Sequence, residues 1–199
     1  MKLVVGLGNP GSRYLGTRHN VGYRVVGCFA ARNSIPLDGE RFESRFGPGS
    51  IQRDAGEPVE VAVLEPLTWM NRSGAAVAQA IRGLGIEEPS SDLLVVFDDV
   101  DLPTGRLRLR PHGGSGGHRG LADVIEALDR SDFARLRFGV GRPEGLADTA
   151  DWVLAPFSAE EEVAVRRRVE AAAEAIEAFL LEGIVPAMNR FNTDPASES

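Results

Sequence analysis

The stretch Leu93-Leu94-Val95-Val96-Phe97, followed at once by Asp98-Asp99-Val100-Asp101, indicates what kind of sheet the chain can form. Five consecutive apolar residues of this type are typical of a strand that is buried on both faces. The N-terminal run Lys2–Leu7 has the same character and ends at the turn sequence Gly8-Asn9-Pro10-Gly11. Buried strands and amphipathic helical segments in one chain predict an α/β fold.

Further strands are expected over residues 43–52, 58–64, 106–110 and 135–141. Apolar residues at helical spacing predict a helix after Asn20 as N-cap, one from Ser73 to about Gly85, a short one through Ile125 and Leu128, a long one over 160–182 and a short one over 186–191. No repeat or linker divides the chain. We therefore expect a single domain over residues 1–191, with a polar tail over 192–199.

Composition indicates a globular protein of ordinary kind. Of the 199 residues, 43% are hydrophobic and 26% are charged, which excludes disorder, collagen and coiled coil as classes. No apolar run approaches the roughly 18 residues that a membrane span needs. The single Cys28 excludes an internal disulfide and a multi-thiolate metal site. With no signal peptide in the N-terminal run, we expect a cytoplasmic protein that does not contact a membrane.

The distribution of charge differs from its total. The net charge is −7, which by itself argues against a nucleic-acid partner. Residues 1–37, however, carry five basic side chains and no carboxylate, and residues 105–142 carry eight arginines against four carboxylates. Because phosphate groups respond to the local field, either segment could form a basic face. Arginines scattered over a solvated surface are the alternative.

The N-terminal loop contains a formal match to a dinucleotide-binding motif. Gly6-Leu7-Gly8-Asn9-Pro10-Gly11 fits G-x-G-x-x-G directly after a strand. The residues that follow, 12–18, have little helical periodicity, and Pro10 lies inside the motif. The motif also needs a carboxylate about 20 residues further on, whereas none occurs before Asp38. A nucleotide-dependent enzyme is therefore the disfavoured alternative.

His19 is the most informative titratable residue. An imidazole can act as a general base near neutral pH, and a carboxylate on one ring nitrogen fixes the tautomer and leaves the other nitrogen free. Asp98, Asp99 and Asp101, after the buried strand, are the possible partners. A magnesium site built from the three aspartates is the alternative, although no phosphate-binding lysine loop accompanies them.

Two carboxamides complete the set. Asn9 and Asn71 lie in neighbouring loops, and such side chains can donate to a carbonyl oxygen as negative charge develops on it. Taken singly, each would more commonly cap a turn. No nucleophile elbow or reactive cysteine setting is present, so covalent catalysis has no evident residue. The set suits hydrolysis of an ester by base-activated water, with neither metal nor cofactor.

At these same residues the sequence resembles bacterial-type peptidyl-tRNA hydrolase. The matching motifs follow in order along nearly the whole chain: Val5–Gly11, Tyr14, Thr17–Gly22, Pro66–Gly74, Asp98–Gly105, Gly113–Leu121, Arg137–Pro143 and Met188–Arg190. The resemblance implies a monomeric single-domain fold, a mixed twisted sheet wrapped by helices. It implies cleavage of the ester that joins a peptide to the terminal ribose of tRNA.

The resemblance also implies residue roles. His19 would be the base, Asp98 would hold it, Asn9 would read the peptide amide next to the ester, and Asn71 would bind substrate and help position the carbonyl or water. Tyr14 and Trp69 would line the site for the terminal nucleotide or peptide. The tRNA-facing surface would carry three basic residues, namely Arg108, Arg110 and Arg137. Peptidyl-tRNA, contacted at its acceptor end and 3′-terminal nucleotides, would be the partner.

One position departs from the family. The glycine loop reads Gly116-Gly117-His118-Arg119-Gly120, where the family usually has asparagine in place of Arg119. We expect Arg119 to pair with a phosphate group of the substrate. The other two histidines, His112 and His118, are expected to make backbone or phosphate contacts. A non-catalytic RNA- or protein-binding relative is the main rival interpretation, which the joint presence of His19, Asp98, Asn9 and Asn71 disfavours.

Overall fold

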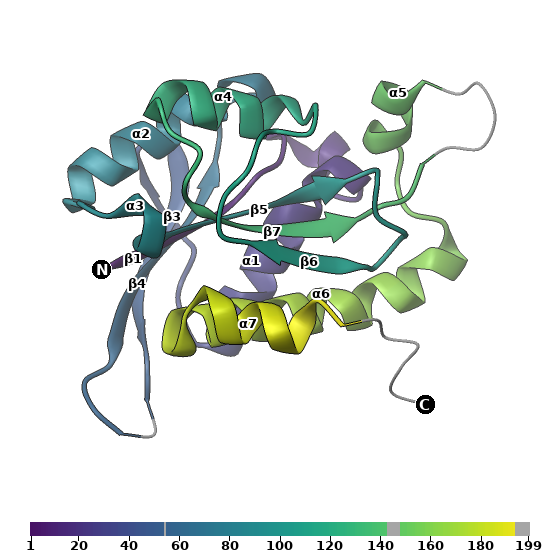
Figure 1. The fold of residues 1–199 in the computed structure, drawn as a ribbon. Coiled ribbons are helices and arrows are strands. Elements are labelled where there is room, and N and C mark those ends of the chain that lie inside the picture. Colours follow the sequence, from purple (N-terminus) through teal and green to yellow (C-terminus); the bar gives the residue numbers. More distant parts are fainter. Residues whose placement is uncertain (54, 143–147, 194–199) are drawn as a thin grey trace.

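The computed structural model describes residues 1–53, 55–142 and 148–193, and its centre is a mixed β-sheet (Figure 1). The sheet contains seven strands: β1 (Lys2–Gly6), β2 (Gly39–Arg41), β3 (Ser44–Ile51), β4 (Val59–Pro66), β5 (Leu93–Asp99), β6 (Leu107–Arg110) and β7 (Ala134–Gly139). Their order is β2-β3-β4-β1-β5-β7-β6. The four central strands β4, β1, β5 and β7 run parallel, whereas the outer strands pair antiparallel. The carboxyl ends of the central strands therefore lie at one edge.

Helices cover both faces of this sheet. They are α1 (Val21–Arg32), α2 (Ser73–Leu84), α3 (Pro89–Asp92), α4 (Arg119–Leu128), α5 (Thr149–Leu154), α6 (Ala159–Glu182) and α7 (Ile184–Phe191), with 3₁₀ turns η1 (Ser12–Tyr14), η2 (Arg18–Asn20) and η3 (Met70–Arg72). Helices α1, α6 and α7 pack on one face, and α2 and α4 pack on the other (Figure 1). The side chains of β1 and β5 alternate between the two apolar cores, because successive residues of a strand point to opposite faces.

The predicted α/β architecture is confirmed, including the single domain and the long C-terminal helix. The expected strands and helices are all present, and Gly85 ends α2 in the left-handed conformation, with φ 65°. Three short elements, β2, α3 and α5, lack a clear sequence period and were not predicted. Asn20 does precede α1, but its side chain does not cap the helix. That side chain bonds to Asn9 instead, as described below.

The glycines of the dinucleotide-like motif serve the packing of β1 against α1. A Cβ atom on Gly6 would lie 2.5 Å from the carbonyl oxygen of Gly22, and one on Gly22 would lie 2.4 Å from the carbonyl oxygen of Leu7. The strand and the helix thus touch through their backbones. The motif leads into the turns η1 and η2 rather than into a helix, so the helix N-terminus that a pyrophosphate needs is missing there.

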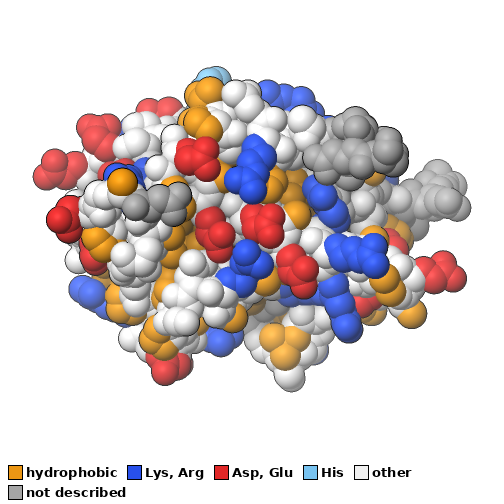
Figure 2. Space-filling model, turned by 90° about the horizontal axis from the view of Figure 1, so that it is seen from below, with side chains coloured by type: hydrophobic (Ala, Val, Ile, Leu, Met, Phe, Trp, Pro, Cys, Tyr) orange, Lys and Arg blue, Asp and Glu red, His pale blue; other side chains and the backbone are white. Residues whose placement is uncertain are grey.

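The expected basic face over residues 1–37 does not form. Helix α6 and its neighbours supply a carboxylate for four of the five basic side chains: Arg18 pairs with Glu161, Arg24 with Glu162, Arg32 with Glu174 and Glu177, and Lys2 with Asp92. Figure 2 shows acidic and basic side chains intermingled over the face that α6 and α7 form. The alternative of arginines on a solvated surface, with carboxylates among them, describes this segment better, because for three of the four pairs the neutralising partner lies more than a hundred residues away in the sequence.

The C-terminal end of the described chain is joined to the sheet. The side chain of Asn192 accepts a hydrogen bond from the backbone N–H of Leu109 and donates one to the Leu109 carbonyl, so it binds the free edge of β6. Residues 194–199 of the expected polar tail lie outside the described part. Among the described residues, no helix is both long and apolar enough to cross a membrane.

One buried acid makes the fold sensitive to pH. Glu65 in β4 is 3% exposed, and its partner across the strands is the half-exposed Arg45, with 2.9 Å between Nη1 and Oε2. Burial raises the pKa of Glu65 to about 7, against the smaller opposing effect of Arg45. The unfolded carboxyl ionises near the ordinary 4.3. Between these values the folded state holds the extra proton, so stability falls as pH rises.

We expect Glu65→Gln to increase the free energy of unfolding at pH 8 by on the order of 1–3 kcal/mol, and so to raise the thermal unfolding midpoint. At pH 5 the substitution should have little effect. The amide keeps an acceptor for Arg45 and removes the cost of a buried charge. Calorimetry at the two pH values checks this. Glu60→Gln, on an exposed position of the same strand, is the control and should show no such difference. Equal shifts at both pH values would contradict the argument.

Candidate active site

A cleft of about 580 Å³ opens at the carboxyl ends of the parallel strands. Its walls come from the segments that follow β1, β4, β5 and β7, from the loop before α4, and from α5. The lining includes the predicted residues Asn9, His19, Trp69, Asn71 and Asp98. Ligands of open α/β sheets bind at this edge, because loops from several strands converge there.

His19 and Asp98 form a close pair in the cleft. His19 Nδ1 lies 2.8 Å and 2.9 Å from the two carboxylate oxygens of Asp98. The Asp98 side chain is 2% exposed and the His19 side chain is 13% exposed. An ionised carboxylate only accepts hydrogen bonds, so Nδ1 carries the proton and donates it. Nε2 has no partner among the described residues and is therefore the basic atom that the cleft presents.

His118 is a second imidazole on the same carboxylate. Its Nε2 lies 2.9 Å from Asp98 Oδ1, while its Nδ1 accepts the backbone N–H of Leu121 at 3.1 Å. The latter bond makes His118 the N-cap of α4. Because Nδ1 is an acceptor, neutral His118 carries its proton on Nε2 and donates it to Asp98. The two histidines therefore hold opposite tautomers, and sequence analysis missed this role of His118.

The charge of Asp98 depends on these two rings. Burial alone would raise the pKa of Asp98, but His118 and then His19, through charge and hydrogen bonds, lower this pKa far below its ordinary value. Asp98 is consequently ionised at neutral pH. The grouping of His19, Asp98 and His118 also has ligand atoms within 4.8 Å of one another, as a metal site would. A metal on His118 Nε2 would compete with the proton that the cap to Leu121 requires there.

Asn9 is held from three directions. Its side-chain Oδ1 accepts the backbone N–H of Met70 at 2.9 Å, and its own backbone N–H and C=O both bond to the carboxamide of Asn20. The Met70 bond fixes the amide orientation, so Nδ2 is the group that Asn9 offers to the cleft. Within the described chain, Nδ2 has no acceptor. Asn20, which sequence analysis assigned to helix capping, is thus a support of the site.

Asn71 and Trp69 lie at the rim of the cleft, and Tyr14 contacts Trp69. Asn71 lies on η3 and is exposed. Trp69 is 48% exposed, and its ring meets Tyr14 edge to face, with the centroids 6.0 Å apart. An exposed tryptophan whose ring is held at the mouth of a cleft is suited to stacking on a planar or apolar ligand. The structure therefore brings together the aromatic pair and the carboxamides that the sequence nominated.

The magnesium alternative is not supported by the positions of the three aspartates. Asp98 is occupied by the two imidazoles, Asp99 pairs with Arg137, and Asp101 pairs with Arg142. Asp99 Oδ1 also accepts the backbone N–H of Asp101 at 2.9 Å. The three carboxylates thus face different partners and do not converge on one point.

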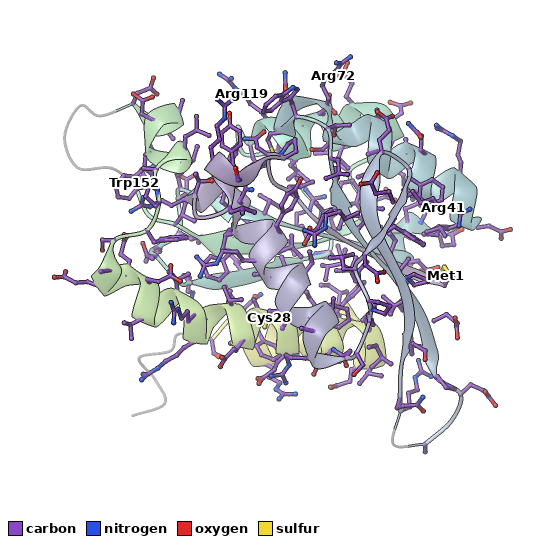
Figure 3. All side chains as sticks on the ribbon, turned by 180° about the vertical axis from the view of Figure 1, so that it is seen from behind. Met1, Cys28, Arg41, Arg72, Arg119 and Trp152 are labelled. Atoms are coloured by element: carbon purple, nitrogen blue, oxygen red, sulfur yellow. The ribbon has the colours of Figure 1, made fainter. Side chains whose placement is uncertain are left out.

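The second basic segment forms a surface beside the cleft. Arg108 in β6 lies directly opposite Arg137 in β7, and Arg110 follows two residues later on the same face. Partial burial and the neighbouring charges of Arg110 and Arg137 lower the pKa of Arg108, which records the repulsion in this cluster. Arg119 begins α4 at the rim, and its side chain points outward between Arg72 and the helix that carries Trp152 (Figure 3). Asp99 offsets one charge of this cluster, at Arg137, and the repulsion that remains is costly unless an anion binds there.

Two buried arginines that sequence analysis did not single out support the loops of the site. Arg18, next to His19, is 3% exposed, and its guanidinium lies 3.7 Å from the ring centroid of Trp152 in α5 and 2.7 Å from Glu161. Arg135 donates to the carbonyls of Gly113 and Gly114 in the glycine loop. Burial, and then the charge of Arg137, lower the pKa of Arg135 to about 10. Sequence position gives no sign of either partner set.

Fold and site together define an α/β enzyme with a histidine–carboxylate centre. A family model described as peptidyl-tRNA hydrolase matches residues 3–199. The chain is 48% identical over 192 residues to the peptidyl-tRNA hydrolase of Symbiobacterium thermophilum, covering 96% of this chain and 99% of that protein. The chain belongs to the peptidyl-tRNA hydrolase family.

A second relative in sequence and one solved structure belong to the same family. The peptidyl-tRNA hydrolase of Chloroflexus aggregans is 43% identical over 192 residues, covering 96% of this chain and 99% of that protein. The crystal structure of peptidyl-tRNA hydrolase from Acinetobacter baumannii superposes with a TM-score of 0.87 at 35% identity, covering 97% of this chain and 95% of that one. The expected resemblance is therefore confirmed along the whole domain.

His118→Asn separates the two bonds of His118. Asparagine keeps an N-cap acceptor for the Leu121 N–H but is too short to reach Asp98. With one donor fewer on Asp98, the hydrogen bond from His19 Nδ1–H to this carboxylate should strengthen, so we expect the Nδ1–H proton resonance of His19, followed by NMR, to move downfield. His112→Asn, at an exposed histidine of the same loop, is the control. An unchanged His19 Nδ1–H resonance in His118→Asn would contradict the shared-carboxylate geometry.

Proposed function

We propose that this protein hydrolyses the ester of peptidyl-tRNA, with His19 as general base and Asp98 as the group that orients it. The main support for this proposal is the hydrogen bond of 2.8 Å between His19 Nδ1 and Asp98, which leaves Nε2 of His19 as a base in the cleft. The family of the chain supplies the substrate class. The reaction releases a peptide with a free carboxylate and a tRNA with a free terminal ribose.

The proton path follows from the tautomer. His19 Nε2 takes a proton from a water molecule as the water oxygen attacks the ester carbonyl carbon. The bond from that carbon to the ribose oxygen then breaks, and Nε2 returns the proton to the departing oxygen. Asp98 remains ionised throughout and stabilises the imidazolium between these two steps. No metal or cofactor takes part in this sequence.

The carboxamides act on the peptide end. Asn9 offers Nδ2, a donor, so it is suited to a carbonyl oxygen of the peptide beside the ester. The side-chain oxygen Oδ1 of Asn9 already accepts the backbone N–H of Met70. Asn71, exposed at the rim, donates to the scissile carbonyl or positions the water. A donor aimed at developing oxyanion charge commonly contributes a factor of 10² to 10³ in rate.

The tRNA end lies on the arginine side. Arg108, Arg110 and Arg137 contact phosphates of the acceptor end, and Arg119 binds a phosphate near the 3′ terminus. Tyr14 and Trp69 stack on the terminal base or on the first peptide residue. The proposal includes a monomer that works in the cytoplasm, in keeping with a single partly buried thiol, Cys28.

The first test is release of an N-acetylated amino acid from tRNA in the presence of excess chelator. We expect activity in the native protein and a loss of at least about a hundredfold in His19→Ala, because general-base catalysis commonly contributes 10²–10⁴-fold. Arg167→Ala, at an exposed residue of α6, is the control and should retain full activity. Binding of tRNA without hydrolysis in the native protein would overturn the proposal in favour of a binding protein. Activity abolished by the chelator would overturn the metal-free base.

Arg119→Asn tests the departure from the family pattern. We expect hydrolysis at low salt to change less than about threefold, whereas the slope of log KM against log salt should fall by about 0.7–0.9, the value of one phosphate contact. Arg167→Asn, on an exposed position of α6, should leave the slope unchanged. A hundredfold rise in turnover for Arg119→Asn would show instead that the arginine impairs the chemistry.

A further inference from the structure

A second cavity adjoins the catalytic cleft. It measures about 730 Å³ and lies between the β2–β3 turn and the segment η3–α2. Trp69 lines both spaces, the catalytic cleft on one side and this cavity on the other. The residues that line the second cavity are Glu40, Arg41, Phe42, Glu43, Ser44, Leu67, Thr68, Trp69, Arg72 and Ala75. None of them was assigned above to the chemistry, apart from Trp69 at the rim.

We propose that this cavity holds the peptide of peptidyl-tRNA beyond its first residue. The inference rests on the proposed function, which places an ester with two different arms at His19. One arm is a polyanion and the other is a polypeptide of variable sequence. The two arms must leave the reacting carbon in different directions, and the surfaces on the two sides of the cleft differ in the chemistry they offer.

Charge distinguishes the two sides. Two carboxylates and two guanidinium groups line the second cavity, so their formal charges cancel. Arg108, Arg110 and Arg137, by contrast, form a basic surface on β6 and β7, on the other side of β5 from β4 and η3. The arginine surface on β6 and β7 attracts a chain of phosphates, whereas the second cavity, with no net charge, does not. The neutral cavity, with apolar Phe42, Leu67 and Ala75, fits a chain of mixed polarity.

One wall of the cavity is a strained turn that several hydrogen bonds hold in place. Phe42 and Glu43 form a two-residue turn between β2 and β3, and both have positive φ, 58° and 52°. Such a turn prefers Asn-Gly, and holding bulkier residues in it carries a cost in backbone strain. Glu43 offsets part of this cost, since its backbone carbonyl accepts the Leu67 N–H at 2.8 Å and its carboxylate accepts Gln79 at 2.5 Å. These bonds fix the distance between the two walls.

Phe42 and Trp69 face the space from opposite walls. Phe42 packs edge to face against Phe46, with centroids 5.7 Å apart, and covers Gly83 of α2, where a Cβ atom would lie 2.3 Å from its ring. Trp69 is held by Tyr14 on the far side. Two anchored aromatic rings thus border this space, and one of them, Trp69, also lines the catalytic cleft. This arrangement predicts that affinity grows with peptide length.

Ala75→Trp tests the assignment. Ala75 is exposed on α2 and lines the cavity, so a large side chain there occupies the space without disturbing the core. The control is Ala164→Trp, the same change at an exposed alanine of α6 on the opposite face of the sheet. Each protein is assayed on tRNA carrying one N-acetylated residue and on tRNA carrying a six-residue peptide. Deacylated tRNA serves as a competitive inhibitor in the same assay.

We expect the native protein and Ala164→Trp to have a higher kcat/KM on the six-residue substrate. Ala75→Trp should lose about tenfold on that substrate, equivalent to about 1.4 kcal/mol, and nothing on the short one. Inhibition by deacylated tRNA should be the same in all three proteins. Equal losses on both substrates, no loss on either, or weaker inhibition by tRNA would each overturn the assignment. Failure of the native protein on both substrates would instead overturn the proposed function.

Discussion

The arrangement of this site depends on one buried carboxylate that two imidazoles share. Asp98 is almost inaccessible to solvent, and its charge is balanced by hydrogen bonds from His19 and His118 rather than by an arginine or lysine. A buried carboxylate without donors would take up a proton instead of staying ionised. The two rings remove that option, and in return the carboxylate decides which nitrogen of each ring carries hydrogen.

Three separate parts of the fold converge on this carboxylate. Strand β5 delivers Asp98, the turn before α1 delivers His19, and the first residue before α4 delivers His118. Backbone contact between Gly6 and Gly22 sets the position of the His19 turn against the sheet, and the cap on Leu121 sets that of His118. Because each element is also packed in one of the two apolar cores, the orientation of the rings follows from the fold itself. The hydrogen bonds of Asn9 to Asn20 and Met70 fix the carboxamide of Asn9 in the same way.

Much of this could be predicted from the sequence, because apolar periodicity is a local signal. The strands around Val95 and Val4 and the long helix α6 were evident from it. His19, Asp98, Asn9 and Asn71 were nominated by residue type and by position at strand ends, and the structure does gather them in one cleft.

What sequence reasoning missed depends on partners that are distant in the chain. Nothing near His118 shows that Asp98, twenty residues before it, will accept its hydrogen bond, and nothing near Arg18 reveals Glu161 or Trp152. Asn20 has the composition of a helix cap but bonds to Asn9 instead. The sequence left open whether the N-terminal segment forms a basic face for the same reason, since its carboxylate partners are supplied by α6 and α3. Short elements such as β2 and α5 contain too few residues to show a period.

The mechanism depends on Asp98 holding His19 with its proton on Nδ1, so that Nε2 is the base. The most direct measurement is the ¹⁵N chemical shifts of the His19 and His118 rings in the neutral state at pH 8, each assigned by the matching His→Asn variant. We expect hydrogen on Nδ1 of His19 and on Nε2 of His118, two opposite tautomers in one protein. Finding His19 with its hydrogen on Nε2 would remove the base from the cleft and overturn this mechanism.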